Sequence, residues 1–467
     1  MAEKDSLVQL REALSLPETP GINKKYIEIM LQGDIPVICV NRSVQKKRAL
    51  PFKALYSHNS LFWQQETNWE YFISVEDLAA VKEEAVTRPG AWETWTGNED
   101  QELTPLAESF GAEYEAIVAM TDAERVHLIE ADKERLDKLI MEKSVDIKVI
   151  TEAMVDTSRE AALVNHAAIM DAINLTDDEA KKITQSLVDS TKSMIKSSTQ
   201  LVSKDLFSNA MMNALMEKSN GTIIHHITSV YLNGIAFLSY YNKLVSTSSA
   251  IIKLRVSFAS KYHEFYCALL PHLAPDDVTL ERVFYKGMRA IPPHYFFDWA
   301  VGFLLHDIGK AAAVEYHEGE AAYNREIVLE HVKQGYASIM NKTSYPQSVS
   351  LIAGYHHEYY GDSAGYGYFR AKLEQHRKAN PKSKQDYCIS YEIEPMMNYE
   401  TLAYFPAKVL EIVDIFDSVT DPNRKYRKPM STEEALVMMQ DEFIEQHRRI
   451  DPILFDIFSK FQREQKK

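Results

Sequence analysis

The strongest constraint on how this chain folds is a histidine–aspartate pair at the end of an apolar run. The residues from Trp299 to Leu305 are apolar, and His306 and Asp307 follow them directly. An ionised carboxylate is costly to bury unless it is paired with a cation or binds a metal ion. Lys310 lies about one helical turn after His306 and is expected to face the same way. Taken alone, the pair is equally consistent with a satisfied core histidine and a capping aspartate.

Further histidines and a second aspartate lie in helical segments of the same part of the chain. His356 and His357 are adjacent, so on a helix their side chains point about 100° apart and both reach one ion only near a helix end. Asp414 lies in an apolar helical run and needs a cation if it is buried. Taken singly, His226 can also be explained as an ordinary core histidine, and His331 as an ordinary surface histidine.

The candidate ligands are imidazoles and carboxylates, without thiolates. Such a set suits first-row transition metals better than calcium, and it is large enough for two ions. Two metal ions a few ångströms apart are a standard arrangement for the hydrolysis of phosphate esters. Asp417 follows Asp414 by one turn and is expected to be structural, with support of a ligand from behind as the alternative.

The composition of the chain indicates its cellular compartment and excludes some classes of binding partner. The three cysteines, Cys39, Cys267 and Cys388, are far apart, which argues against a disulfide framework and favours a reducing compartment. The formal net charge of -15 would repel a long polyanion, so DNA is not an expected partner. No apolar stretch reaches the ~18 residues of a membrane span, and the polar N-terminus does not match a signal peptide. We therefore expect a cytoplasmic protein without a membrane span.

The N-terminal part of the chain has the pattern of a small domain. Residues 1–20 are polar and are predicted to form a tail, and residues 21–88 are predicted to form a small α+β domain. Ser74 and Asp77 have the spacing of a capping box, which predicts a helix from Val75. The predicted strands are short β-favouring runs separated by turn residues, namely Tyr26–Met30, Ile35–Asn41, Leu50–Tyr56 and Trp69–Ile73.

The remainder of the chain is predicted to be helical. Residues 89–104 contain Pro89 and Gly90 and are predicted to be a linker. Residues 105–205 carry apolar residues at helical spacing, which predicts a scaffolding bundle through which a homodimer would form. Residues 206–467 continue the helical pattern and contain the candidate ligands.

In their order, these motifs resemble those of the HD-GYP subgroup of the HD phosphohydrolase superfamily. The resemblance covers roughly residues 206–445 and rests on His226, His306-Asp307-Ile-Gly-Lys310, His331, His356-His357-Glu358, Gly365-Tyr366 and Asp414. It implies a mainly α protein, in which an all-helical phosphohydrolase domain with a buried metal centre follows the helical segment and the small α+β domain. The small domain resembles one found ahead of some HD-GYP modules, which implies a regulatory role for it. The implied activity is hydrolysis of cyclic di-GMP to the linear dinucleotide pGpG or to GMP, in bacterial second-messenger signalling.

The resemblance also implies roles for individual residues. One metal ion would be held by His226, His306, Asp307 and Asp414, and the second by His331, His356 and His357, with Asp307 as the bridging ligand. The two divalent ions are expected to be iron or manganese. Asp307 and Lys310 are the expected catalytic residues, with Lys310 facing the scissile phosphate. The implied substrate-binding residues are Lys310, Tyr366, Arg424 and Arg427, the arginines as planar donors to phosphate.

The chain departs from the family pattern at several places. The Gly-Tyr-Pro signature is Gly365-Tyr366-Gly367 here, so its proline is missing. Members with three metal ions carry a glutamate where this chain has Thr222, which favours two ions. Two long spacings predict insertions at 246–292 and 368–405, and the second insertion is expected to act as a lid.

Two other functions remain compatible with these residues. One is a phosphohydrolase acting on another cyclic dinucleotide or a nucleotide monoester, which the altered Gly-Tyr-Gly loop favours. The other is a signalling module that binds cyclic di-GMP and turns it over slowly or not at all, which the insertions and the missing proline favour. The complete ligand set together with Lys310 favours the enzyme, because buried charges without a ligand would be costly.

Overall fold

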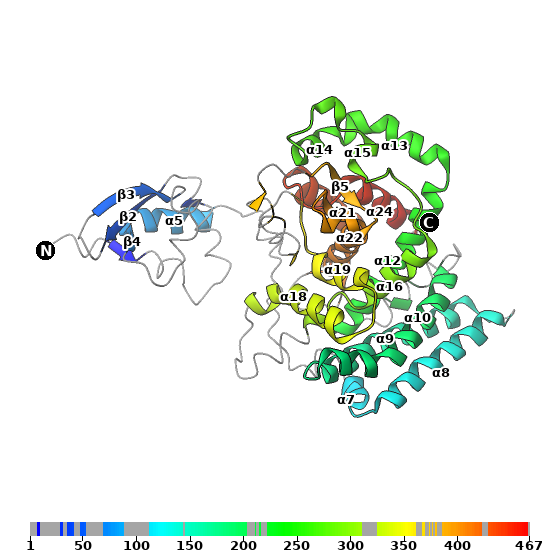
Figure 1. Ribbon diagram of the computed structural model, residues 1–467. Coiled ribbons are helices and arrows are strands. Elements are labelled where there is room, and N and C mark those ends of the chain that lie inside the picture. The colour runs from blue at the N-terminus through cyan, green and yellow to red at the C-terminus, as the bar shows by residue number, and fades with distance from the viewer. Residues whose placement is uncertain are drawn as a thin grey trace. The chain divides into compact units, whose positions relative to one another are not determined.

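The computed structural model describes most of the chain, in several stretches. The described residues are 7–9, 29–30, 35–41, 47–52, 69–87, 112–142, 145–202, 211, 214–215, 222–310, 325–360, 367–368, 373, 376, 379–380, 385–422 and 428–465. Contacts between residues divide the chain into two compact units, Met1–Asp100 and Gln101–Lys467 (Figure 1). The predicted linker 89–104 lies outside the described residues.

A four-stranded antiparallel sheet dominates the described part of the smaller unit. In spatial order its strands are β1 (Leu7–Gln9), β4 (Trp69–Ser74), β2 (Pro36–Asn41) and β3 (Lys47–Pro51). The predicted helix start is confirmed, and Ser74 Oγ makes one bond of a capping box by accepting a 2.9 Å hydrogen bond from the backbone N–H of Asp77. Helix α5 (Val75–Thr87) begins directly after this serine.

Several sequence predictions for this unit are wrong. Part of the predicted tail 1–20 is strand β1, which pairs with β4. The predicted strand Tyr26–Met30 ends in helical residues, Ile29 and Met30. Strand β3 starts earlier than predicted, at Lys47. Ile29 and Met30 were mistaken for strand residues because short apolar runs do not distinguish a strand from a helix. The start of β3 was missed because it is an edge strand that begins with basic residues, which do not favour a strand in the sequence pattern.

The larger unit is mainly helical, as predicted. Its first helices are α7 (Ala112–Val118), α8 (Asp122–Met141), α9 (Ile147–Ala172), α10 (Asp177–Val202), α12 (Ile223–Val245), α13 (Ser248–Lys261), α14 (His263–Leu269), α15 (Leu280–Val283) and α16 (Pro293–Leu304). They are followed by α18 (Arg325–Lys342), α19 (Gln347–Tyr355), α21 (Ile393–Met397), α22 (Phe405–Thr420), α23 (Thr432–Gln440) and α24 (Pro452–Glu464). In the described part of the chain, no helix combines the length and the apolar character needed to cross a membrane.

The prediction of an all-helical domain over 206–467 is wrong at the second insertion. Within 368–405, strands β5 (Tyr387–Ser390) and β6 (Thr401–Tyr404) pair in parallel, and a β-bridge joins Ile389 to Phe284 of the first insertion. Both strands are largely buried, and β6 leads directly into α22. These strands are therefore part of the core, and the prediction that the insertion acts as a lid is wrong for this part of it.

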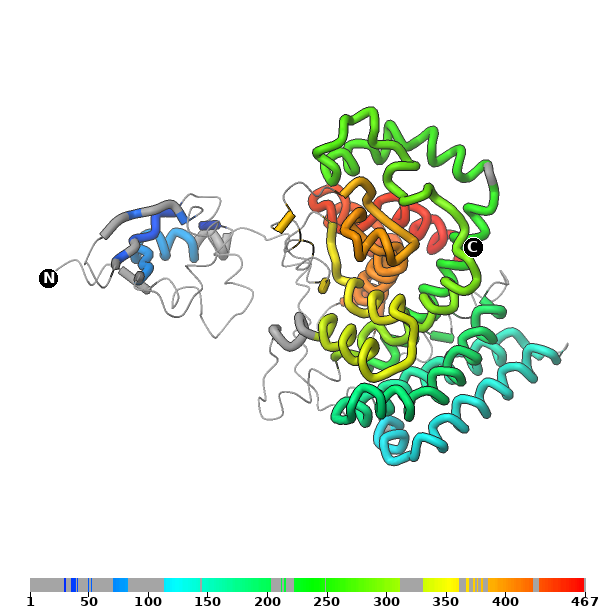
Figure 2. Tube along the Cα trace, in the orientation of Figure 1, coloured from blue at the N-terminus to red at the C-terminus, as the bar shows by residue number. Residues whose placement is uncertain are grey.

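The helices of residues 105–205 also differ from the prediction, because they do not form a separate bundle. Helix α9 packs against α12 and α18, and α10 packs against α16 and α18 (Figure 2). Asn165 on α9 accepts a 2.7 Å hydrogen bond from Tyr345 and donates a 2.9 Å bond to Thr191 on α10. The middle of α9 is buried on all sides, which is the property of a central helix rather than an amphipathic outer one. The homodimer stays a prediction.

Candidate metal centre

The predicted metal ligands come together in the interior of the larger unit. His226 lies in the first turn of α12, which Thr222 caps by accepting a 3.2 Å hydrogen bond from the N–H of His225. The apolar helix α16 ends just before His306 and Asp307 and so delivers both into the core. The remaining candidates are His331 on α18, His356 and His357 at the end of α19, and Asp414 on α22. All of these side chains are buried.

A glycine allows the His306-Asp307 turn to approach α18. A Cβ atom at Gly309 would lie 1.8 Å from the carbonyl oxygen of His331 and 2.5 Å from the backbone nitrogen of Gly335. Only glycine leaves room for such an approach. The close packing brings the Asp307 carboxylate within reach of His331, although the two residues lie on different elements.

The first group of donor atoms contains His226, His306 and Asp307, whose ligand atoms all lie within 4.8 Å of one another. Asp307 Oδ2 lies 3.5 Å from His226 Nε2 and 3.3 Å from His306 Nε2. Asp414 adjoins the group, because its Oδ1 lies 3.0 Å from His226 Nε2. These are the residues that the sequence assigned to one metal ion.

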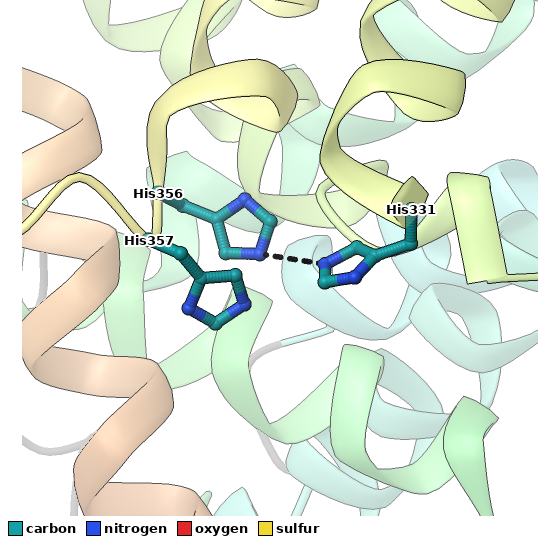
Figure 3. A group of neighbouring side chains, drawn as sticks. All are labelled: His331, His356 and His357. Atoms are coloured by element: carbon teal, nitrogen blue, oxygen red, sulfur yellow. Dashed lines mark hydrogen bonds between the residues drawn. The ribbon is translucent and has the colours of Figure 1, made fainter. Parts of the chain in front are cut away.

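The second group contains His331, His356 and His357 (Figure 3). The Nε2 atoms of His331 and His356 lie 3.4 Å apart. The ring of His357 lies beside both, with its centroid 4.0 Å from that of His356. Both adjacent histidines can reach the same group because they follow Tyr355, the last residue of α19. These are the residues that the sequence assigned to the second ion.

Asp307 connects the two groups. Its Oδ2 faces the first group, whereas its Oδ1 lies 3.4 Å from His331 Nε2 and 3.8 Å from His356 Nε2. On the other side, Asp414 Oδ2 lies 3.9 Å from His357 Nε2. A carboxylate whose two oxygens point to different donor groups has the geometry of a bridging ligand.

Hydrogen bonds fix the orientation of the imidazole rings. The Nδ1–H of His306 donates to the carbonyl of Phe303, and that of His356 to the carbonyl of Ala353, both over 2.9 Å. Because a carbonyl oxygen only accepts, each Nδ1 carries the proton, and in the neutral ring Nε2 is then the nitrogen that can bind a metal ion at the centre. Burial also lowers the pKa of His356 to about 3. For His356, the neutral ring required of a metal ligand is therefore the stable form.

Among the described residues, His306 Nε2 and Asp307 Oδ1 are buried without a hydrogen-bond partner, and Asp307 Oδ2 is held by an ion pair with Lys310. Burial alone would raise the pKa of Asp307, but the ammonium of Lys310, 2.9 Å from Oδ2, and the imidazole of His306 hold it well below its usual range. Burial alone would also raise the pKa of Asp414, but the neighbouring His226 lowers it well below its usual range. Ionised carboxylates and neutral imidazoles are the donors of divalent transition metals. The residues therefore fit such ions.

Asp417 supports His226 from behind, which was the alternative to the structural role that the sequence favoured. Its Oδ2 lies 2.7 Å from His226 Nδ1, and its Oδ1 accepts a hydrogen bond from Ser229. A carboxylate in this position selects the tautomer in which Nε2 is free to bind a metal. The signal in the sequence was the spacing of one turn from Asp414 on α22.

Replacing Asp417 by asparagine is expected to weaken metal binding at the first group by about 10–100-fold, because the neutral amide no longer fixes the His226 tautomer. The measurement is a competition titration with a chelating dye. Asp421, buried one turn further along the chain, gives the matched control Asp421→Asn, which should bind metal like the wild type. Unchanged affinity in Asp417→Asn would exclude an orienting role.

The predicted substrate-binding residues Tyr366, Arg424 and Arg427 lie outside the described residues. Gly367, next to Tyr366, is described, and its N–H donates a 3.2 Å hydrogen bond to the carbonyl of His357. A Cβ atom at Gly367 would lie 2.4 Å from Glu358 Oε2 and 2.8 Å from Glu358 Cβ. A proline would lose the hydrogen bond and collide with Glu358. The missing proline of the signature thus has a local structural reason.

His166 is a neighbour of the centre that the sequence did not indicate. It lies on α9, is fully buried, and interacts electrostatically with Asp307 and His306. Burial lowers its pKa to about 3. His166 belongs to an apolar helix that the sequence assigned to the scaffold, so its proximity follows only from the packing of α9 against α12.

No protein-family model, curated protein or solved structure matches this chain. Functional conclusions for the centre rest on its geometry and on the order of its motifs.

Proposed function

We propose that the chain is a metal-dependent phosphodiesterase that hydrolyses cyclic di-GMP to pGpG or GMP. The observation that carries the proposal is the pair of buried donor groups joined by Asp307, since a two-ion centre is a standard arrangement for phosphate ester hydrolysis. The choice of substrate rests on the resemblance of the motif order to the HD-GYP subgroup. Iron or manganese is proposed for both ions, and both belong to the first-row transition metals that nitrogen and oxygen donors bind.

When bound, two divalent ions supply Lewis-acid stabilisation of the charge on a phosphoryl group. The chain contributes the fixed geometry around them. Backbone carbonyls hold the rings of His306 and His356, and Asp417 holds His226. Burial of these side chains excludes bulk water and strengthens every electrostatic interaction at the centre.

Lys310 gives the centre a cation that retains access to solvent. Its side chain is 18% exposed, and its ammonium lies 2.9 Å from Asp307 Oδ2. A positive charge at this place attracts the phosphate of an anionic substrate to a chain whose net charge is -15. It also stabilises the negative charge that develops during hydrolysis.

A second candidate is a phosphohydrolase for a different cyclic dinucleotide or a nucleotide monoester. Gly367 favours it, because its contacts with His357 and Glu358 give the loop after Tyr366 a conformation that the signature proline could not adopt. A changed loop beside the ligands would change which base or sugar fits, while leaving the metal chemistry intact.

The proposal predicts turnover of cyclic di-GMP by the purified full chain under reducing, anaerobic conditions with Mn²⁺ or Fe²⁺. Products are followed by chromatography, and other cyclic dinucleotides and nucleotide monoesters are tested in parallel. The metal-depleted protein is the control and should be inactive until metal is added back.

Formation of pGpG or GMP supports the proposal, whereas turnover of another nucleotide supports the second candidate. Tight binding of cyclic di-GMP without product by the metal-loaded protein would contradict an enzyme and favour a sensor. If the metal-loaded protein neither binds nor hydrolyses any of these nucleotides, the phosphodiesterase, the second candidate and the sensor are all contradicted.

A further inference from the structure

The turn that carries His356 and His357 is held from outside α19. The helix ends at Tyr355, and a 3.1 Å hydrogen bond from Glu358 N to Tyr355 O closes the turn. The chain then continues through Tyr360, whose N–H donates a 3.0 Å hydrogen bond to the carbonyl of Arg449. Two candidate ligands of one ion thus lie on a short turn, and its position depends on contacts with distant parts of the chain.

Lys408 on α22 provides the central contact. Its side chain is 0% exposed, and its ammonium donates 2.9 Å hydrogen bonds to the carbonyl oxygens of Glu358 and Arg449. Lysine is rarely fully buried, because removing an ammonium from water costs several kcal/mol unless it is well paired. The remaining partners are Glu411, 2.5 Å away, and the ring of Tyr360, 4.0 Å from the ammonium.

The same ammonium also joins the turn to the start of α24. The carbonyl of Arg449 accepts hydrogen bonds from both Lys408 and Tyr360. The hydroxyl of Tyr360 donates a 3.1 Å bond to Asp451, which caps α24 through the N–H groups of Ile453 and Leu454. Residues 449–451 and α22 therefore hold the turn together.

We infer that Lys408 is a positioning residue for the second group of metal ligands. It holds the carbonyl of Glu358, next to His357, at a fixed place relative to Asp414, which lies on the same helix as Lys408. This inference rests on the proposed metal function. Metal sites tolerate displacements of only about 0.5 Å, so a looser turn would lower the affinity of the second group without unfolding the chain.

The test is the double variant Lys408→Met with Glu411→Leu. Replacing Lys408 alone would leave Glu411 buried without its cation, and burial already raises the pKa of Glu411 to about 8. Replacing a buried ion pair by apolar residues of similar size is often neutral for stability. The double variant is therefore expected to fold, and the loss of the carbonyl contacts can be measured separately from a loss of stability.

Metal titration of the double variant is expected to show about 10–100-fold weaker binding of one equivalent, with the other equivalent unchanged. In metal-free protein, hydrogen exchange of residues 355–360 should be faster than in the wild type, because the carbonyl of Glu358 loses its anchor. The single variant Glu411→Gln is the matched control. It keeps both carbonyl contacts of Lys408 and should retain affinity and protection.

A second control separates positioning from general destabilisation. Arg125 on α8 is another buried cation that donates to backbone carbonyls, those of Ile117 and Val118. Arg125→Met should lower the melting temperature and leave metal affinity unchanged. If the Met/Leu variant does not fold, Lys408→Gln with Glu411→Gln, in which two amides can pair, is measured in the same way.

Wild-type metal affinity and wild-type protection of residues 355–360 in a folded double variant would overturn the inference. If the wild-type chain itself binds no metal, the proposed function fails. Hydrogen exchange of the metal-free proteins still decides whether Lys408 anchors the turn, so the two failures are distinguishable.

Discussion

Replacing Asp307 by alanine is expected to remove bound metal and phosphodiesterase activity together. Its Oδ1 faces His331 and its Oδ2 faces His226 and His306, so the substitution takes a donor from both groups at once. Metal ions stabilise such transition states by several kcal/mol, and turnover should therefore fall by about 10³-fold or more. Metal content by mass spectrometry and product formation by chromatography are measured on the same preparation.

Asp298 supplies a matched control, since it lies half-buried on α16, the helix that precedes Asp307. Asp298→Ala should keep both metal and turnover. Added metal should also raise the melting temperature of the wild type, because a ligand at 100 times its Kd stabilises the folded state by about 2.7 kcal/mol. Asp307→Ala should show no such rise. Full metal content and full turnover in Asp307→Ala would refute the centre.

Replacing Lys310 by alanine is expected to slow turnover by about 10²–10³-fold while the metal stays bound. The ammonium is close to Asp307 Oδ2 and partly exposed, where a substrate phosphate would arrive. Its loss removes electrostatic stabilisation of the developing charge, and single groups of this kind contribute about that much. The measurement compares kcat at saturating substrate with the metal content of the same protein.

Lys333→Ala is the control for a change of net charge, because Lys333 is an exposed lysine on α18 near His331. It should leave kcat unchanged. Loss of metal in Lys310→Ala would contradict a direct role in the chemistry. Lys310 would then act through the ionisation of Asp307, whose pKa it lowers.

The resemblance of the motif order implied the grouping of the candidate ligands, whereas the residues themselves predicted only that buried carboxylates need partners. Asp307 follows an apolar run and Asp414 lies within one, so both carboxylates needed partners. In the structure both carboxylates lie close to His226, 3.5 Å and 3.0 Å from its Nε2. The mainly helical character likewise followed from local periodicity, which depends only on neighbouring residues.

What the sequence did not predict depends on contacts between distant residues. His166 and Lys408 lie in apolar helical stretches, and nothing local distinguishes them from a scaffold histidine or a solvated lysine. Their roles follow from the packing of α9 on α12 and from carbonyl groups contributed by Glu358 and Arg449. The strands β5 and β6 were missed because each has only four residues, too few for a clear alternation.

The packing of α9 and α10 also limits how such a chain can be recombined during evolution. A gene fusion or deletion that cut near residue 205 would part α9 from α12 and α18. The central turns of α9, buried from Ala161 to Met170, would then face water. The two helical stretches must therefore be inherited together. The smaller unit is a compact unit with internal contacts of its own.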